Sequence, residues 1–466
     1  MTNELSSLVV IFTEFYYWVT VVFMFLIHVG FCMYEVGASR YKSHMHTLMK
    51  NTMLIPLVTI TFFFFGWWIY FAFVNGPWII GPLVDAPHAT VWSELMGAHM
   101  GGLATQDTLT VDDTAFWARI NGVFWAAFLL FSWTAASIVS GSVIERIRPS
   151  AFWILAVLIG SVTWIIDAAW GWSWNGWMVQ KLGYHDAYAS GVIHAIAGGF
   201  ALGVLVVLGP RIGKFRADGT PRDIHPHNPW LVTIGLFLIY TGFWGFYVAC
   251  NIPIIDVYGG DMLDVADKSY FSATNIYLQP TTLSAITLNF LMSLSGGLMA
   301  AYIVSKGDAF WTYSGGLAGV IGASAGNDLY HPIQAMLIGA FVVVIIYKMH
   351  FWVERRFKID DAVGAVAVHG YAGFLGVCIA GFMLWGYPSS PFEGYAPITP
   401  WGQFIGAIIM FFVLGFIPAW IMSKILNGMG MLRIPREIEM VGLDINFEEQ
   451  READARDLRE AIRSEA

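Results

Sequence analysis

Two histidines of this chain lie in apolar segments whose local sequences match. His194 stands in the segment Gly191–Gly198 and His369 in Val366–Gly373, and both segments contain the pattern His-x-x-x-Gly. A neutral imidazole has one nitrogen that donates and one that accepts a hydrogen bond, so two facing rings could pass a proton between them. A lone histidine in such a segment is more often a core residue, and two unrelated core histidines remain the alternative. The matched pair favours a shared functional site.

Asp186 precedes His194 by eight residues, at the predicted start of the same helix. A carboxylate in this position can accept hydrogen bonds from the free backbone N–H groups of the first helical turn. It could equally support a bound cation by its charge, and the sequence leaves both interpretations open. His28, in the first apolar segment, has no matching partner motif and is interpreted as a core histidine.

The composition of the 466-residue chain indicates a polytopic membrane protein. Hydrophobic residues make up 57% and charged residues only 12% of it, whereas soluble domains carry about 25% charged residues. We find no cofactor fingerprint, metal-ligand cluster or nucleophile–base pair in the sequence, which argues against an enzyme and predicts no cofactor and no metal. The net charge of −9 gives no support for nucleic-acid binding. Because the first basic residue is Arg40, the first apolar segment lacks the start of a signal peptide and should be retained.

Eleven apolar runs are long enough to cross a bilayer, which takes about 20 residues of helix. We expect an all-α polytopic membrane fold of eleven transmembrane helices, with residues 1–426 as the membrane domain and residues 427–466 as a cytoplasmic tail. The eighth run is short and rich in glycine. The runs cover residues 8–36, 48–74, 115–143, 151–171, 190–209, 230–250, 279–304, 310–326, 333–352, 363–386 and 401–425.

Basic residues predict the orientation of these helices. Of the 24 Lys and Arg residues, all but Arg119, Lys181 and Lys268 lie in or beside the odd-numbered connections or in the tail. Because cytoplasmic loops are enriched in Lys and Arg, the N-terminus is predicted outside and the C-terminus inside. The acidic segments 75–114 and 251–278 then form exterior loops.

An odd number of spans permits two halves of opposite topology. Spans one to five and six to ten would form inverted repeats of five helices each, with the eleventh helix appended. His194 then closes the first half and His369 the second. Pathways in such folds lie between the repeats near the membrane midplane, so the two rings should meet there, about 2.7–3.2 Å apart between nitrogens.

Five short motifs stand in a fixed order from the first span to the tail: Gly37-x-x-Arg40-x-Lys42 with Thr47–Asn51, Gly141–Arg148, Asp186 with His194, Asp360-Asp361 ahead of His369-Gly370, and Gly442-Leu443-Asp444. Together they resemble the ammonium transporter, methylammonium permease and Rhesus family, on its ammonium transporter branch. The resemblance covers nearly the whole chain. It implies a homotrimer in the cytoplasmic membrane with one pore per subunit, and a tail that communicates with a PII-type signalling protein.

The resemblance also assigns roles to individual positions: His194 and His369 as the pore histidines, Phe131 and Phe246 as a stacked gate above them, and Trp174, Cys250 and Asp186 as the ammonium recruitment site. An indole face attracts a cation by about 0.5–2 kcal/mol. Without the resemblance, Trp174 could equally belong to an aromatic belt and Cys250 could be a small packing residue. Neither phenylalanine could be singled out by sequence alone.

The sequence departs from the family pattern at four places, three of them at the outer site and one, Glu35, near the inner end of the first span. Cys250 stands where the family usually has serine, Tyr247 replaces a habitual asparagine, and Glu35 replaces a glycine. Residues 187–191 read Ala-Tyr-Ala-Ser-Gly, where the family prefers an aromatic residue, a small residue and two glycines. A hydroxyl accepts an N–H bond better than a thiol, so the outer site is expected to bind ammonium more weakly than in typical members.

The resemblance implies an ammonium transporter that recruits ammonium outside, deprotonates it and conducts ammonia past the gate and the histidine pair. A bare cation in a dry pore costs tens of kcal/mol by Born estimates, and ammonium avoids this cost by releasing a proton, whereas potassium has no proton to release. The departures leave an ammonium sensor with little flux as an alternative from another functional class. A neutral-gas channel of the Rhesus kind is a third possibility.

The end of the tail has charged residues at helical spacing with one small apolar edge, formed by Leu458 and Ile462. Such charge pairs contribute only about 0.2–0.5 kcal/mol each, so the helix would be marginal alone. We expect this edge to dock on a neighbouring subunit or a cytoplasmic partner, with a free solvated tail as the alternative.

Overall fold

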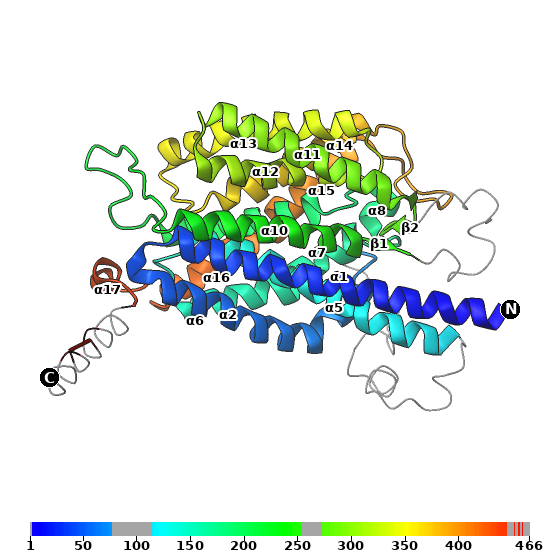
Figure 1. The fold of residues 1–466 in the computed structure, drawn as a ribbon, viewed down its shortest axis with the longest axis horizontal. Coiled ribbons are helices and arrows are strands. Elements are labelled where there is room, and N and C mark those ends of the chain that lie inside the picture. The colour runs from blue at the N-terminus through cyan, green and yellow to red at the C-terminus, as the bar shows by residue number, and fades with distance from the viewer. Residues whose placement is uncertain are drawn as a thin grey trace.

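The computed structural model describes residues 2–76, 113–253 and 273–444, with four isolated positions of the tail. Figure 1 shows the long helices running side by side along one axis, with the start of α1 (Thr2–Ala38) at one end and α17 (Arg436–Val441) at the other. A short antiparallel sheet lies at the end where α1 begins. We call this the sheet end of the bundle and the opposite end the α17 end.

Helices dominate the part of the chain before residue 210. Two of the spans change to a wider π-helical turn part of the way along, and a third begins with one. The elements after α1 are η1 (Tyr41–Ser43), α2 (His44–Thr61), η2 (Phe62–Gly66), α3 (Trp67–Ala72), α5 (Asp113–Ser142), α6 (Pro149–Leu158), η5 (Ile159–Thr163), α7 (Trp164–Gly171), α8 (Trp177–Leu182), η6 (Ser190–Ala195) and α9 (Ile196–Leu208).

The second part of the chain adds the sheet, in which β1 pairs with β2 and β2 with β3. Its elements are α10 (Pro229–Ala249), β1 (Asn251–Ile252), β2 (Ala273–Asn275), β3 (Pro280–Thr281), α11 (Leu283–Val304), α12 (Ala309–Ala323), η8 (Ser324–Gly326), α13 (Pro332–Phe357), η9 (Val366–Tyr371), α14 (Ala372–Met383), α15 (Pro400–Ile408), η10 (Ile409–Phe416), α16 (Ile417–Gly428) and α17.

Ten helices of the described ranges are long and apolar enough to cross a membrane, so the chain is a multi-pass membrane protein. They coincide with the predicted spans except the eighth, 310–326, which forms the 15-residue helix α12. At 1.5 Å per residue, α12 is about 22 Å long, shorter than the apolar layer of about 30 Å. Residues 314–323 of α12 are buried among its neighbours, so it does not need to face lipid. The count of eleven spans therefore stays a prediction.

Glycines let two pairs of helices approach closely. Helices α1 and α10 lie side by side (Figure 1), and a Cβ atom on Gly235 of α10 would lie 2.5 Å from the backbone nitrogen of Tyr34. In the same way, a Cβ on Gly198 would lie 2.1 Å from the Cα of Gly370. Small residues of this kind are how membrane helices pack without a hydrophobic driving force. The second contact brings the histidine-bearing segments together.

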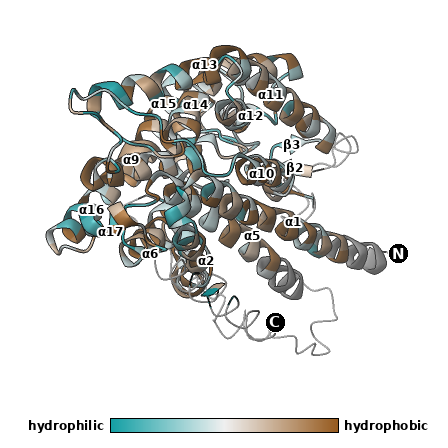
Figure 2. Cartoon of the chain, turned by 60° about the vertical axis from the view of Figure 1, so that its left-hand side comes forward, coloured by the Kyte–Doolittle hydropathy of each residue, from teal (hydrophilic) through white to brown (hydrophobic). Residues whose placement is uncertain are grey.

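The outer surface of the bundle is apolar. Large hydrophobic side chains on its outer helices are exposed, among them Phe64, Trp230 and Phe341. Figure 2 shows brown, hydrophobic helices with teal, hydrophilic residues gathered toward the connections. A soluble protein rarely exposes so continuous an apolar surface, whereas a lipid-facing one must.

Buried charges fasten the loops at the α17 end. The Asp360 carboxylate accepts hydrogen bonds from Arg211 through its backbone N at 2.9 Å, its Nε at 2.8 Å and its Nη2 at 3.0 Å. Arg146 donates to the backbone oxygens of Asp360 and Gly209 at 2.5 and 2.8 Å. Burial alone would raise the pKa of Asp360, but Arg211 and Arg146 outweigh burial and hold it below its usual range.

The start of the tail packs on the same end. Arg433 donates to the backbone oxygens of Leu208 and Pro210 and to Glu439. The Asp444 carboxylate accepts from the backbone N of Met45 and His46, both at 2.9 Å, and so caps α2. The apolar edge predicted at Leu458 and Ile462, and most of the predicted exterior loops 75–114 and 251–278, lie outside the described residues.

Candidate functional site

The structure brings His194 and His369 into direct contact. Their Nδ1 atoms are 3.0 Å apart, within the range expected from the sequence, and both side chains are buried. Only one of the two Nδ1 atoms can carry the proton of this hydrogen bond, so the two neutral rings must be opposite tautomers. One Nε2 is then a donor and the other an acceptor. The pair can therefore offer a donor and an acceptor to a small molecule at the same time.

Both histidines lie in π-helical turns, His194 in η6 and His369 in η9. Such turns are rare and recur at functional sites because the extra residue re-aims a side chain. The Nε2 atom of His194 is buried and has no hydrogen-bond partner in the structure. This nitrogen is free to bond a small ligand.

An aspartate carboxylate caps the start of each of these two π-helical turns, a buried one before η6 and a half-buried one before η9. The Asp186 Oδ2 atom accepts from the backbone N of Gly191 and Val192 at 2.7 and 2.9 Å. In the other half, Asp361 lies eight residues before His369 and accepts from Ala365 and Val366 at 3.0 and 2.8 Å. The cap interpretation of Asp186 is therefore correct. The Oδ1 atom of Asp186 is buried without a partner, so a further role in supporting a cation stays open.

Burial raises the pKa of Asp186 to about 6, although hydrogen bonds from the backbone of Val192 and Gly191 act in the opposite direction. The side chain is also held by Tyr184, whose hydroxyl donates to Oδ2 at 3.2 Å.

Phe131 and Phe246 contact each other beside the histidines. Their ring centroids are 4.8 Å apart at 89°, so the two rings expected to stack meet edge to face. Edge-to-face contact is favoured because the positive ring edge meets the negative face of the other ring. Phe246 lies 5.7 Å from the ring of His194 at 22°. Both phenylalanines are buried, and neither faces lipid.

Two aromatic residues that the sequence did not single out, Trp172 and Phe243, extend the row of rings formed by Phe131, Phe246 and the histidines. Trp172 meets Phe131 at 4.8 Å between centroids, and its Nε1 donates to the backbone oxygen of Asp186 at 3.0 Å. Phe243 stacks against Phe246 at 4.9 Å. Phe243 could have been found, since residues three apart share one face of a helix. The row runs from Trp172 through the phenylalanines to the histidines.

Trp174 and Cys250 occupy the sheet end of the site. Trp174 is half-buried and packs on Phe392, with centroids 5.0 Å apart. The indole that contacts Phe131 is instead that of Trp172. Cys250 is fully buried one turn beyond Phe246, and its thiol donates to the backbone oxygen of Phe246 at 3.1 Å.

Two of the departures from the family pattern pack on each other. Tyr247 stacks on Tyr188 with centroids 4.3 Å apart at 8°. The Tyr247 hydroxyl is 2.6 Å from Ser324 Oγ and accepts from Asn327 Nδ2 at 3.0 Å. Ala189 has a φ of 69°, a left-handed conformation that glycine adopts without strain. This explains why glycine is preferred in this segment.

Three ionisable residues inside spans were given no site role from the sequence, although their position alone makes them candidates. Asp167 is fully buried in α7, and neither of its carboxylate oxygens has a hydrogen-bond partner. Glu35 and Lys50 are buried with Glu35 Oε2 and Lys50 Nζ 3.7 Å apart. His28, by contrast, is the core residue that was expected. Its ring nitrogens lie 3.4 Å from Leu130 O and 3.3 Å from Ser137 Oγ.

Comparison with known proteins identifies the family of the chain. A family model described as the Ammonium Transporter Family matches residues 15–452. The chain is 29% identical over 443 residues to Ammonium transporter Amt2 of Archaeoglobus fulgidus, which covers 89% of this chain and 82% of that protein. It is 30% identical over 366 residues to Ammonium transporter Amt2 of Haloferax mediterranei, which covers 78% of this chain and 73% of that protein.

Solved structures share the fold. One titled Sensor Amt Protein matches with a TM-score of 0.70 and 22% identity, covering 94% of this chain and 99% of that chain. Candida albicans Mep2 matches with a TM-score of 0.67 and 17% identity, covering 91% and 86%. At these identities the likeness shows the fold alone.

Proposed function

The chain belongs to the ammonium transporter family, and from this membership we propose that it moves ammonium nitrogen across the cytoplasmic membrane. Ammonium binds at the sheet end, where Trp174, Cys250 and Asp186 form the recruitment site. There it releases a proton, which passes to the histidine pair, and it enters the pore as ammonia.

Phe131 and Phe246 form the gate of this pathway, because their buried edge-to-face contact leaves an apolar constriction that a hydrated ion cannot enter. His194 and His369 then bond the ammonia and relay the proton. The observation that carries the proposal is the 3.0 Å contact between the two Nδ1 atoms directly beside the gate. An isolated core histidine has no need of a second histidine as its partner.

The selectivity of such a pore follows from proton chemistry. Ammonium and potassium are similar in size, and either bare ion would cost tens of kcal/mol to bring into a dry pore. Ammonium escapes this cost by giving up a proton, whereas potassium has none to give. Recordings on protein reconstituted into liposomes should therefore show currents with ammonium and none with potassium. Equal currents with the two ions would contradict the proposed mechanism.

An ammonium sensor with little flux is the second candidate function. It is favoured by the recruitment site, where the thiol of Cys250 is bonded to its own helix, and by the Tyr247–Tyr188 stack beside it. Both features would slow the passage of ammonium without preventing its binding. Binding of ammonium without current in the same liposomes would favour the sensor over the transporter.

We also propose the arrangement of the chain in the membrane: eleven spans, with spans one to five and six to ten as inverted repeats, N-terminus outside and C-terminus inside. The matched aspartate-capped π-helical turns at Asp186 and Asp361 support the repeat. The start of α1 and α17 lie at opposite ends of the bundle (Figure 1), as an odd number of crossings requires. Three copies would form the assembly, each with residues 1–426 as its pore domain and residues 427–466 as a tail for a PII-type partner.

Replacing Cys250 with serine should strengthen ammonium recruitment. The serine hydroxyl can keep the bond to the backbone oxygen of Phe246 and accepts an N–H bond better than the thiol. The half-saturating ammonium concentration on the outer side should fall about two- to tenfold, as expected for one neutral hydrogen bond of about 0.5–1.5 kcal/mol. Cys378→Ser, a matched change at a half-buried cysteine of α14, is the control. An unchanged concentration dependence would rule out direct contact between Cys250 and ammonium.

A further inference from the structure

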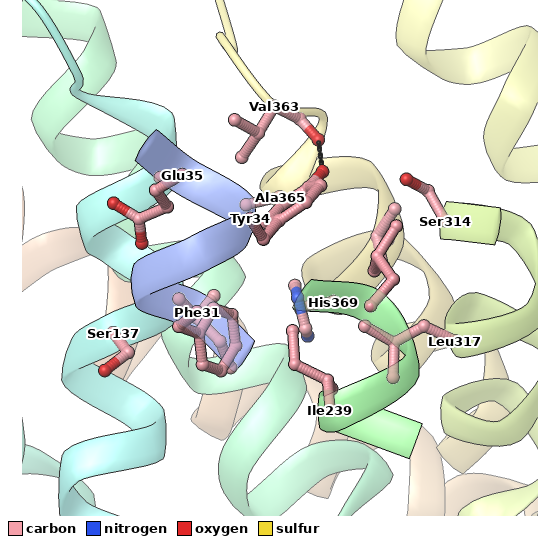
Figure 3. A pocket seen from close by; sticks show the side chains of 14 residues that line it. Phe31, Tyr34, Glu35, Ser137, Ile239, Ser314, Leu317, Val363, Ala365 and His369 are labelled. Carbon is pink, nitrogen blue, oxygen red and sulfur yellow. Dashed lines mark hydrogen bonds between the residues drawn. The ribbon is translucent and has the colours of Figure 1, made fainter. Parts of the chain in front are cut away.

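A narrow cavity, open at its mouth, adjoins His369 toward the α17 end. Figure 3 shows that it is bordered by α1, which contributes Phe31, Tyr34 and Glu35, and by His369 from η9. Helix α5 adds Gly141. In the proposed topology this cavity is the inner vestibule of the pore, so anything that leaves the histidine pair toward the cytoplasm passes through it.

Glu35 has one carboxylate oxygen bound and one free. Its Oε2 atom accepts from Asn51 Nδ2 at 2.9 Å and from Ser140 Oγ at 2.6 Å. Its Oε1 atom is buried and has no hydrogen-bond partner in the structure. Gly141 faces this oxygen, and a Cβ there would lie 3.6 Å from it, so the absence of a side chain keeps the approach from the cavity open.

Lys50 stands behind the carboxylate. Its Nζ is 3.7 Å from Oε2 of Glu35 and donates to the backbone oxygen of Ser140 at 2.8 Å. Both charged side chains are buried, 0–1% exposed, inside the membrane domain. Buried ion pairs persist when their hydrogen bonds are fully satisfied, and a half-satisfied carboxylate in a membrane span is a functional-site candidate. The unsatisfied oxygen therefore calls for a ligand that donates hydrogen bonds.

We propose that Glu35 forms an inner ammonium site, in which Oε1 accepts an N–H hydrogen bond from ammonium on the cytoplasmic side of the histidine pair. The ligand class is a small monovalent cation with N–H donors, and the inference rests on the proposed function. The positive charge of Lys50 weakens the binding of a cation at this site. A lone buried carboxylate would hold a cation too tightly for release, and conduction requires binding that is also weak enough to leave. The fixed positive charge of Lys50 supplies that weakening.

Two substitutions test the site because their effects have opposite signs. Glu35→Gln keeps the shape and removes the charge, so the half-saturating ammonium concentration measured from the inner side should rise about tenfold or more. Lys50→Met removes the opposing charge and should lower the same concentration. Glu437→Gln, at an exposed glutamate of α17, removes one negative charge at the same end and should leave the inner half-saturating ammonium concentration unchanged.

The double variant Glu35→Gln/Lys50→Met separates a functional from a structural role. Without the carboxylate there is no cation binding for Lys50 to weaken, so the double variant should behave like Glu35→Gln alone. Shifts of equal sign in the two single variants, or no shift in either, would overturn the inner site. The proposed function would stand in that case, because it is tested by the ammonium current of the wild-type protein and not by these variants.

If the wild-type protein carries no ammonium current, a crystallographic probe tests whether a cation binds beside Glu35. Thallium(I) is a monovalent cation of similar size to ammonium that scatters X-rays anomalously, and although it has no N–H group, a carboxylate oxygen without a hydrogen-bond partner can coordinate it directly in the place of the N–H donor. Crystals of the full chain soaked in a thallium(I) salt should show an anomalous peak beside Glu35 Oε1, and crystals of Glu35→Gln should lack it. A wild-type map without that peak would refute the inner site.

Discussion

Replacing His194 with leucine is expected to reduce the ammonium current by a factor of about 100 or more, the usual contribution of a positioned proton-transfer group. Leucine fills a similar volume next to Phe246 but has no nitrogen. His369 would then lose the partner 3.0 Å away that fixes its tautomer. Ammonia would meet one ring instead of a donor and acceptor pair, and the proton relay would be broken. The measurement is ammonium-driven current in liposomes that contain the purified protein.

The double variant His194→Leu/His369→Leu shows whether the rings act as a unit. If they do, removing both should cost little more than removing one, because groups that work together are strongly non-additive. His331→Asn is the control, since His331 caps α13 at the exposed surface and asparagine caps equally well. Multiplicative losses in the double variant would mean that the histidines act separately and that their contact is incidental.

The sequence was sufficient for the parts of the fold that depend on hydropathy and local spacing. Apolar runs predicted the spans, and the matched segments around His194 and His369 predicted their contact, because ionisable residues in a membrane must face one another or the pore. The cap formed by Asp186 followed from its position before a helix. Each of these depends on a single segment or on a repeated pattern.

Contacts between segments distant along the chain could not be predicted in this way. Trp172 and Trp174 stand two residues apart in a connection, so periodicity does not say which of them meets Phe131. The edge-to-face angle of Phe131 and Phe246 depends on how α5 and α10 cross. The short helix α12 reads as a span by composition, and only its enclosure by neighbouring helices explains its length.

Glu35 shows most clearly why some site residues could not be found from the sequence. An acidic residue in the first span was noticed only as a departure from a pattern, since its partners Asn51, Ser140 and Lys50 come from α2 and α5. No spacing rule links a residue of the first span to these positions. Position inside a span was the one usable signal, and it applies equally to Asp167.

Asp360→Asn is expected to lower the free energy of unfolding by about 3–5 kcal/mol, the cost of removing one partner from a buried ion pair. The Asp360 carboxylate accepts three hydrogen bonds from Arg211, and Arg146 is bound to its backbone oxygen. With a neutral amide, Arg211 would remain buried with less compensation. Because these residues join the loops after α5, α9 and α13, the α17 end should loosen first.

The contribution of Asp360 to stability should depend on pH, which gives a specific test of this prediction. The pKa of Asp360 is lowered in the folded protein, so the folded state binds a proton less readily than the unfolded chain, whose aspartates titrate near about 3.9. The stabilisation from Asp360 is therefore present above that pH and is lost as the pH falls through the folded pKa. Denaturant titrations in detergent micelles should show a gap between wild type and variant that is full at neutral pH and shrinks below about pH 4.

Asp218→Asn provides the matched control, because Asp218 is exposed in a loop at the same end, where surface changes stay within about 0.5 kcal/mol. Adding Arg211→Met to Asp360→Asn should recover part of the lost stability, since it removes the uncompensated charge along with its partner. A gap between wild type and Asp360→Asn that stays constant from neutral to acid pH would mean that packing, and not the charge of Asp360, holds this end together.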